Sequence, residues 1–312
     1  MPRIVSLISS ATEIVDALGM TAHLVGRSHE CDYPEAVKAL PMCTRPRIAV
    51  DADSREIDRL VKESARNSIS IYDVFDDVIE RLEPTHILTQ VQCEVCAVSL
   101  RDVEAAFSRG MKGQPQVVSL QPDSLAQIWE DIRRVAAALG IAQRGEKVVR
   151  ALRSRLHSPP HQSRDRKGAE SSNPTVACIE WMEPLMAAGN WTPELIELAG
   201  GVNLFGEAGK HSPWMEWQQL VDADPDVIVI APCGFDLART EQELHWMTSR
   251  PGWDKLRARV YVADGNQYFN RPGPRVVETF QMLCEMLHPE QFAPTLRGHA
   301  WRPVGPPGLP FG

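Results

Sequence analysis

The sequence lacks several patterns that would assign it to a class at once. No apolar run approaches the ~20 residues needed to cross a bilayer, which excludes a membrane-spanning helix. No basic stripe with interleaved aromatic residues occurs, and 33 Lys+Arg against 41 Asp+Glu leave a formal charge of -8. We therefore expect no nucleic-acid partner. A nucleophile elbow, a phosphate loop and a Rossmann glycine fingerprint are also missing, and we predict that the chain is not an enzyme.

The amino terminus carries no secretory pattern, which would be a basic start, an apolar run and a small-residue cleavage site. Instead, residues 3–7 already have the composition of a buried strand. The seven cysteines are an odd number and include the pair Cys93 and Cys96, a spacing commoner in reduced compartments than in disulfide frameworks. We expect a cytoplasmic location, or a periplasmic one if a leader has been removed from the sequence.

The composition is that of a globular protein, with 43% hydrophobic and 24% charged residues. A length of 312 residues is about twice that of an average domain and favours two lobes. Apolar β-rich runs alternate with amphipathic stretches, as in parallel sheets covered by helices. Strands are expected at 3–7, 23–26, 86–90, 117–120, 175–180, 227–231 and 260–263, and helices at 12–18, 192–199 and 274–287.

These elements predict an N-terminal α/β lobe over 1–122 and a C-terminal α/β lobe over 173–292. Residues 123–157 have helical spacing throughout and predict one long connecting helix, interrupted only at Gly140 and Gly145. Residues 158–172 are polar and predict a flexible loop, and residues 293–312 predict a tail rich in Pro and Gly. An acid-proline turn precedes a strand in both lobes, at Glu83 and at Asp224, which suggests two lobes of similar design.

Ligands of open α/β sheets bind beyond the carboxyl ends of the strands. After the first strand, Ser10 and Glu13 fit a capping box at a helix start. Large aromatic and polar residues follow the later strands, and we expect them to form a stacking surface for a large, flat, partly apolar ligand, unless they pack beneath the loops. The ligand-binding candidates are Tyr33, Gln90, Trp181, Trp191, Trp214, Phe235, Tyr268, Phe269 and Arg271.

A resemblance rests on several segments kept in order: 3–7, Ala11-Thr-Glu13, Asp32-Tyr33-Pro34, 200–205, Pro213-Trp214, 224–229, 268–271 and Pro274-Arg275. Over about 3–290 the chain resembles the helical-backbone (class III) periplasmic substrate-binding proteins of ABC importers, and among them the cobalamin-binding proteins. The resemblance implies two Rossmann-like lobes with mostly parallel sheets, joined by one long helix, with the ligand cleft between them.

It also implies non-catalytic binding of cobalamin or a related corrinoid or metal chelate. By this match Tyr33, Trp214 and the 268–271 segment line the cleft.

The resemblance further implies an ABC permease as a possible partner of a monomeric binding protein. Family members carry an acidic residue on each lobe, upstream of the acid-proline turn, that docks onto permease arginines. The equivalent positions here are Asp77 and Gln218. Gln218 lacks the charge, and a hydrogen bond to a charged group is worth about 1.5–3 kcal/mol. The predicted docking to a permease is therefore weakened.

The cysteines leave two alternatives open. Cys31, Cys93 and Cys96, with His29, would make a metal site for zinc, cobalt or an iron-sulfur cluster. The chain would then be a thiol-based metal or iron-sulfur protein on the same scaffold. The second alternative is a Cys-dependent enzyme that uses Cys93 with His29 or His211 as its base.

Overall fold

The structure is a computed structural model that describes residues 1–67, 70–90, 114–157 and 173–305. It divides into two compact units, Met1–Leu152 and Arg153–Gly312, which we call unit 1 and unit 2. Among the described residues no helix is both long and apolar enough to span a membrane.

Unit 1 is built on a sheet of four parallel strands in the order β2-β1-β5-β6. The strands are β1 (Ile4–Ser6), β2 (Leu24–Arg27), β5 (His86–Gln90) and β6 (Gln116–Leu120). The two central strands, β1 and β5, are apolar and buried because helices and loops cover both faces, as in other parallel sheets. All four strands expected in this half of the chain are confirmed to within two residues at each end.

The helices of unit 1 follow from capping and apolar spacing. The α-helices are α1 (Ser9–Ala17), α2 (Ser54–Arg66), α3 (Asp76–Leu82), α5 (Leu125–Ala138) and α6 (Ala142–His157), with 3-10 turns at Thr21–His23 and Glu35–Ala39. The end of α6, from Arg153, belongs to unit 2. Asp53 caps α2 by accepting from the Glu56 backbone N–H, and Ser124 caps α5 in the same way through Gln127. A short antiparallel pair, β3 (Thr44–Pro46) and β4 (Tyr72–Val74), lies apart from the main sheet.

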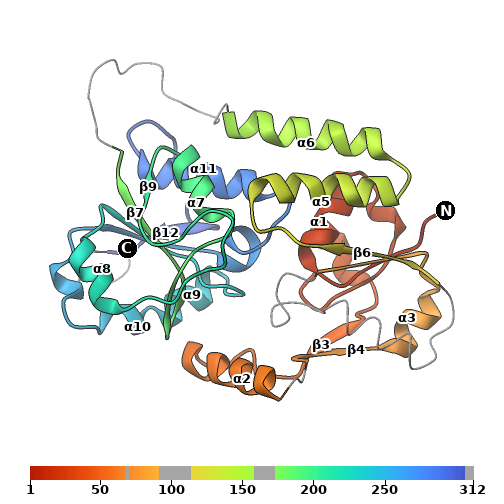
Figure 1. Cartoon of the computed structure of the whole chain (residues 1–312), viewed down its shortest axis with the longest axis horizontal. Helices are drawn as coiled ribbons and strands as arrows, with labels where there is room; N and C mark the ends of the chain where they lie inside the picture. Colours follow the sequence, from red (N-terminus) through yellow and green to blue (C-terminus); the bar gives the residue numbers. More distant parts are fainter. Residues whose placement is uncertain (68–69, 91–113, 158–172, 306–312) are drawn as a thin grey trace. The chain divides into compact units, whose positions relative to one another are not determined.

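The prediction of one continuous helix over 123–157 is wrong. The segment forms α5 and α6, separated by a turn in which Gly140 has φ +73°, a left-handed conformation that glycine adopts without strain. The two helices lie side by side (Figure 1), and a Cβ on Gly145 would be 2.6 Å from the Cβ of Ala136. Arg133 Nε also pairs with Glu146 Oε1 at 2.8 Å. The 3.6-residue period continues through the turn, so the pattern alone concealed the break.

Unit 2 repeats the topology of unit 1. Its strands are β7 (Thr175–Met182), β8 (Leu185–Ala187), β9 (Val202–Asn203), β10 (Val227–Ile230), β11 (Arg259–Ala263) and β12 (Trp301–Pro303). The parallel part has the order β9-β7-β10-β11, which corresponds strand for strand to β2-β1-β5-β6. The antiparallel strands β8 and β12 extend it on β7 and β11. The predicted fold of two α/β lobes with mostly parallel sheets is confirmed.

The acid-proline turns have the same backbone conformation in both units. Glu83 ends α3 with φ 43° and Asp224 ends α8 with φ 38°, both in the left-handed region. A proline follows each and prevents the helix from continuing. The strand after each turn, β5 in unit 1 and β10 in unit 2, is the third of the four parallel strands of its unit in chain order. The repeated phrase in the sequence thus marks equivalent points of two similar units.

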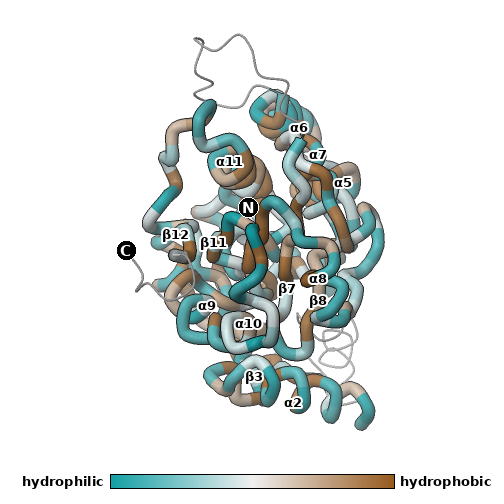
Figure 2. Tube along the Cα trace, turned by 90° about the vertical axis from the view of Figure 1, so that its left-hand side faces the viewer, coloured by the Kyte–Doolittle hydropathy of each residue, from teal (hydrophilic) through white to brown (hydrophobic). Residues whose placement is uncertain are grey.

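The helices of unit 2 are α7 (Thr192–Leu198), α8 (Trp217–Ala223), α9 (Leu237–Glu243), α10 (His245–Thr248) and α11 (Val276–Leu287), with a 3-10 turn at Trp253–Lys255 and a π-helical turn at Gly265–Phe269. Hydrophobic residues concentrate on the strands and along α11 (Figure 2). The last turn of α6 is joined to α11 by an ion pair, Arg155 Nη2 to Glu278 Oε1 at 2.9 Å.

The predicted tail over 293–312 is wrong for its described part. β12 pairs antiparallel with β11, and Ala300 and Trp301 are buried. The segment is anchored by the buried carboxylate of Glu285, which accepts hydrogen bonds from Thr295 N at 3.0 Å and from Trp301 Nε1 at 2.8 Å. The Pro and Gly residues of 293–305 therefore do not mark a loose tail.

Candidate functional site

The strand order locates the binding edge of each unit. In unit 1 the chain leaves β1 towards β2 on one side and later returns to β5 on the other side. In unit 2 the equivalent strands are β7, β9 and β10. The crevice beyond the carboxyl ends of strands at such a switch point is where open α/β sheets bind ligands. The site residues are therefore sought after β1, β2 and β5 in unit 1 and after β7, β10 and β11 in unit 2.

The capping box expected at Ser10 and Glu13 does not form. The N-cap of helix α1 is Ile8, two residues before the expected Ser10, and no side chain caps the helix. The hydroxyl of Ser10 is buried and has no hydrogen-bond partner in the described part of the chain. Thr12 Oγ1, two residues further, lies 2.8 Å from Ser6 Oγ and joins the strand end to the helix. These hydroxyls make the β1 edge polar but enclosed.

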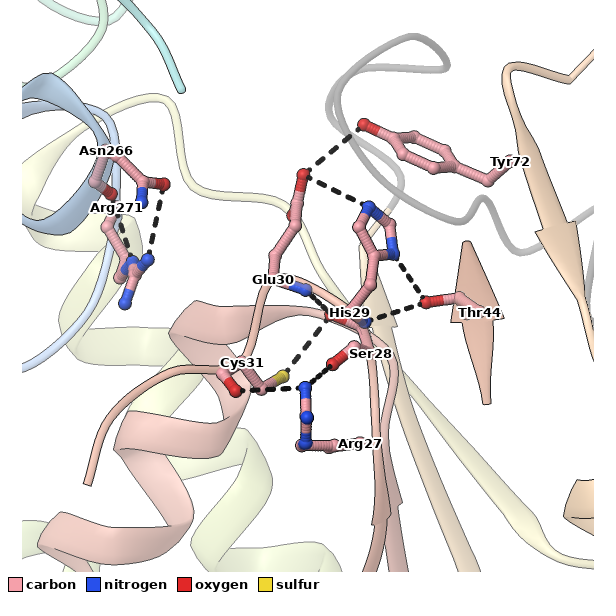
Figure 3. Close-up of polar contacts among 9 residues, drawn as sticks. All are labelled: Arg27, Ser28, His29, Glu30, Cys31, Thr44, Tyr72, Asn266 and Arg271. Atoms are coloured by element: carbon pink, nitrogen blue, oxygen red, sulfur yellow. Dashed lines mark hydrogen bonds and ion pairs between the residues drawn. The ribbon is translucent and has the colours of Figure 1, made fainter. Parts of the chain in front are cut away.

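The loop after β2 is held by Arg27, whose guanidinium donates to the carbonyl oxygens of Ser28 at 3.0 Å and Lys38 at 3.2 Å. Within it the Cys31 thiol is buried and lies 3.3 Å from Ser28 Oγ (Figure 3). Thr12 Oγ1, on α1, lies 3.0 Å from the same sulfur. Burial raises the pKa of Cys31 above its ordinary value. The thiol is thus protonated near pH 7 in the metal-free protein, because burial disfavours the charged thiolate.

His29, two residues earlier, points to different partners (Figure 3). Its Nδ1 lies 2.8 Å from Thr44 Oγ1, its Nε2 lies 3.9 Å from Glu30 Oε1, and its ring centroid is 5.3 Å from that of Tyr72. Burial, followed by repulsion from Arg27, lowers the pKa of His29 to about 4. The imidazole is therefore neutral near pH 7.

The predicted convergence of His29 with the cysteine set is not seen in the described part, because His29 and Cys31 face separate partners. Within the described ranges, no group of three or more His, Cys, Asp and Glu side chains could hold a metal ion. Cys93 and Cys96 lie outside the described residues, so the three-cysteine site and the Cys93-based enzyme stay predictions.

The remaining unit 1 candidates differ in exposure. Tyr33 follows the β2 loop and is 41% exposed, whereas Gln90, the last residue of β5, is buried. Asp77 lies exposed in the first turn of α3 and pairs with Arg81 at 2.7 Å. Gln218 holds the corresponding place in α8 and donates to Asp222 Oδ1 at 2.7 Å. Both predicted docking residues are thus on helix starts that precede the acid-proline turns.

Four predicted aromatic ligand contacts in unit 2 are buried: Trp181, Trp191, Phe235 and Phe269. The Trp181 and Phe235 rings pack with centroids 5.2 Å apart, and Trp191 Nε1 donates to the Phe269 carbonyl at 3.1 Å. These residues pack beneath the loops, which is the alternative that the sequence left open. Tyr268 is half-buried, and the Arg275 guanidinium lies 4.6 Å from its ring centroid.

Arg271 is also buried and serves the π-helical turn after β11. Its Nε donates to the Asn266 carbonyl at 3.1 Å, and its Nη2 lies 3.3 Å from Asn266 Oδ1 (Figure 3). Nearby, burial raises the pKa of Asp264 to about 6, although Gln267 N–H and Arg271 act in the opposite direction. Arg271 therefore stabilises the turn that carries Tyr268.

Trp214 differs from the buried aromatics because 54% of it is exposed. Its neighbours pair with β8: Ala187 N donates to the Pro213 carbonyl at 3.0 Å, and Met215 N donates to the Leu185 carbonyl at 3.0 Å. Trp214 thus stands opposite Met186, which in turn pairs with Trp181 near the carboxyl end of β7. The backbone holds a large aromatic ring open to solvent at the binding edge of unit 2.

Sequence reasoning missed Glu180 and Ser212. Ser212 Oγ donates to Glu180 Oε2 at 2.8 Å and accepts from Gly189 N at 3.0 Å. Burial raises the pKa of Glu180 to about 7, against the bonds from Ser212 and Gly189 and the charge of His211. No sequence signal marked the pair, because a lone Glu in a strand and a lone Ser in a loop 32 positions apart are ordinary.

Two α/β units of equal strand order, with an exposed aromatic at a strand-end edge, define the class of bilobal α/β binding proteins. The family described as periplasmic binding protein matches residues 4–260, and the chain belongs to this family. The resemblance proposed from the sequence is confirmed. Members of this family bind substrates without catalysing a reaction, and membership of the family supports a non-catalytic role.

Curated relatives span most of the chain at low identity. A vitamin B12-binding protein of Photorhabdus laumondii subsp. laumondii is 22% identical, with 92% of this chain and 88% of the relative covered. A vitamin B12-binding protein of Vibrio cholerae is 21% identical over 91% of this chain and 88% of its own length. An uncharacterized ABC transporter substrate-binding lipoprotein of Bacillus subtilis is 21% identical over 93% and 81%.

Solved structures share the fold. A periplasmic heme-binding protein from Roseiflexus, in its apo form, superimposes with a TM-score of 0.65 at 22% identity, covering 92% of this chain and 98% of that one. The periplasmic vitamin B12-binding protein of Vibrio cholerae gives a TM-score of 0.57 at 19% identity, covering 92% and 96%. At these identities the likeness establishes the fold and leaves the ligand to chemical argument.

Proposed function

We propose that the protein binds cobalamin, or a related corrinoid or metal chelate, as the substrate-binding component of an ABC importer. The observation that carries the proposal is Trp214, which backbone pairing holds 54% exposed at the carboxyl end of β7. An exposed indole is a stacking surface for a large ring system, and aromatic residues contribute strongly to binding energy. Tyr33 offers a second exposed aromatic ring after β2 of unit 1.

The relatives support this ligand class without deciding within it. Several curated relatives are named vitamin B12-binding proteins, and structural neighbours include heme-binding proteins. Corrin and heme are both flat, largely apolar macrocycles around a metal, so one stacking surface serves either. The thiol-based alternative has less support, because the Cys31 thiol contacts Thr12 and Ser28 whereas the His29 ring faces Thr44 and Glu30.

An ABC permease is part of the proposal. Substrate-binding proteins of this family serve such permeases, and one relative is named as an ABC transporter component. Asp77 and Gln218 occupy equivalent exposed helix starts in the two units. We propose that they face the permease, with Asp77 making the charged contact.

The test is a calorimetric titration of the purified full chain with cyanocobalamin and, separately, with hemin. Loss of a stacked, buried aromatic side chain removes about 1.5–3 kcal/mol, or roughly 10- to 150-fold in Kd. Trp214→Ala should weaken binding by that factor. Trp246→Ala, a loss of a partly buried indole on α10, should leave Kd within about twofold, because the Trp246 Nε1 donates locally to Glu243 Oε2 at 2.8 Å rather than within the segment that carries Trp214.

If neither compound binds at micromolar protein, the proposed ligand class is wrong. If both bind but the two tryptophan variants behave alike, the class stands and Trp214 is not the contact.

A further inference from the structure

The segment that carries Trp214, residues 206–216, forms backbone hydrogen bonds with β8 and with the residues just after β8. Besides the pairing of Pro213 and Met215 with β8, Asn190 N donates to the Lys210 carbonyl at 2.7 Å. The approach is close enough that a Cβ on Gly189 would lie 2.5 Å from the Lys210 carbonyl oxygen. We call residues 206–216 the Trp214 segment.

One side chain of this segment reaches a half-buried acceptor on the central strand β7. Ser212 is 4% exposed, and its hydroxyl bridges Glu180 Oε2 on β7, at 2.8 Å, and the backbone N–H of Gly189, at 3.0 Å. The bridge lies two residues before Trp214. A hydroxyl that accepts from a backbone amide and donates to a carboxyl group uses both of its roles, so the geometry at Ser212 is closely defined.

We infer that Glu180 and Ser212 are positioning residues for the ligand: their hydrogen bond fixes the Trp214 segment so that the indole is held in its stacking orientation before the ligand arrives. This inference rests on the proposed function. Backbone pairing alone attaches the segment to β8, which is an edge strand of the sheet in the order β12-β11-β10-β7-β8. The hydrogen bond from Ser212 to Glu180 on β7 attaches the segment to an interior strand as well.

The consequence is an effect on affinity through preorganisation. A ring that is held in place loses little conformational freedom on binding, whereas a ring on a loosened segment must be ordered by the ligand. Removal of the Ser212 hydroxyl should weaken cyanocobalamin binding by about tenfold, the equivalent of one hydrogen bond. Trp214 itself would still be present, which distinguishes a positioning residue from a contact residue.

The experiment uses the full chain labelled with 5-fluorotryptophan and observed by fluorine NMR, with the Trp214 signal assigned from Trp214→Phe. In Ser212→Ala we expect the Trp214 signal to shift or broaden while the Trp246 signal, assigned in the same way, is unchanged. Ser249→Ala is the matched control, since Ser249 Oγ donates locally to the His245 carbonyl on the surface. The Trp214 signal of Ser249→Ala should be the same as that of the parent protein.

Glu180→Gln is the conservative variant. It keeps an oxygen acceptor for Ser212, so the Trp214 signal and the Kd for cyanocobalamin should remain close to those of the parent. An unchanged Trp214 signal in Ser212→Ala overturns the inference, whether or not the variant binds cyanocobalamin or hemin. A changed signal with an unchanged Kd also overturns it. If the parent binds neither cyanocobalamin nor hemin, the proposed function fails, and the fluorine spectra still decide whether the anchor holds Trp214.

Discussion

Glu285 is the residue whose loss should affect stability most clearly. It is 2% exposed on α11, and its carboxylate accepts from Thr295 N at 3.0 Å, Thr295 Oγ1 at 2.6 Å, Leu296 N at 3.2 Å and Trp301 Nε1 at 2.8 Å. Glu285→Ala leaves two backbone amides and one indole N–H without this acceptor. The buried Trp301 indole N–H, left unsatisfied, costs about 1–3 kcal/mol. The two partly buried amides each lose a hydrogen bond to a charged group, worth about 1.5–3 kcal/mol, and water recovers part of that loss.

We therefore expect Glu285→Ala to lower the free energy of unfolding by about 3–5 kcal/mol, measured by urea denaturation followed by circular dichroism. Glu290→Ala, an exposed glutamate just after the same helix, is the matched control and should change stability by less than about 0.5 kcal/mol. Glu285→Gln keeps one acceptor oxygen and should fall between the two. A loss below about 1 kcal/mol for Glu285→Ala would refute the view that this carboxylate anchors residues 293–303.

Two further predictions concern other parts of the chain. The pKa of His29 is lowered to about 4, so the folded protein binds fewer protons than the unfolded chain between about pH 4 and 6.5, and stability should fall as pH drops through that window. The His29→Gln variant should show a shallower fall in urea midpoint than the parent, and an equally steep one would contradict the assignment. Gly206→Ala would place a Cβ 1.8 Å from the Ala188 carbonyl oxygen. It should displace the Trp214 segment and change the fluorine signal of Trp214, whereas Gly209→Ala, where a Cβ meets nothing within 4 Å, should leave that signal unchanged despite its backbone strain.

The two-unit plan could be predicted because it depends on local chemistry repeated along the chain. The strands β5 and β10 are short β-rich runs preceded by an acid-proline turn, and proline ends a helix wherever it falls. The break between α5 and α6 could not be predicted in the same way. Apolar spacing continues across Gly140, and only the packing of Gly145 against Ala136 shows that the second helix turns back.

The sequence by itself determined which residues are aromatic and follow strands, and the order of motifs that placed the chain in its family. Tertiary structure decided which of those aromatics are open to solvent: Trp181 and Trp191 found partners in the unit 2 core, whereas Trp214 did not become buried. Exposure depends on contacts between segments distant in the sequence, and a local pattern carries no information about them. For the same reason only the fold brought Ser212 to Glu180 and revealed how the Trp214 segment is held.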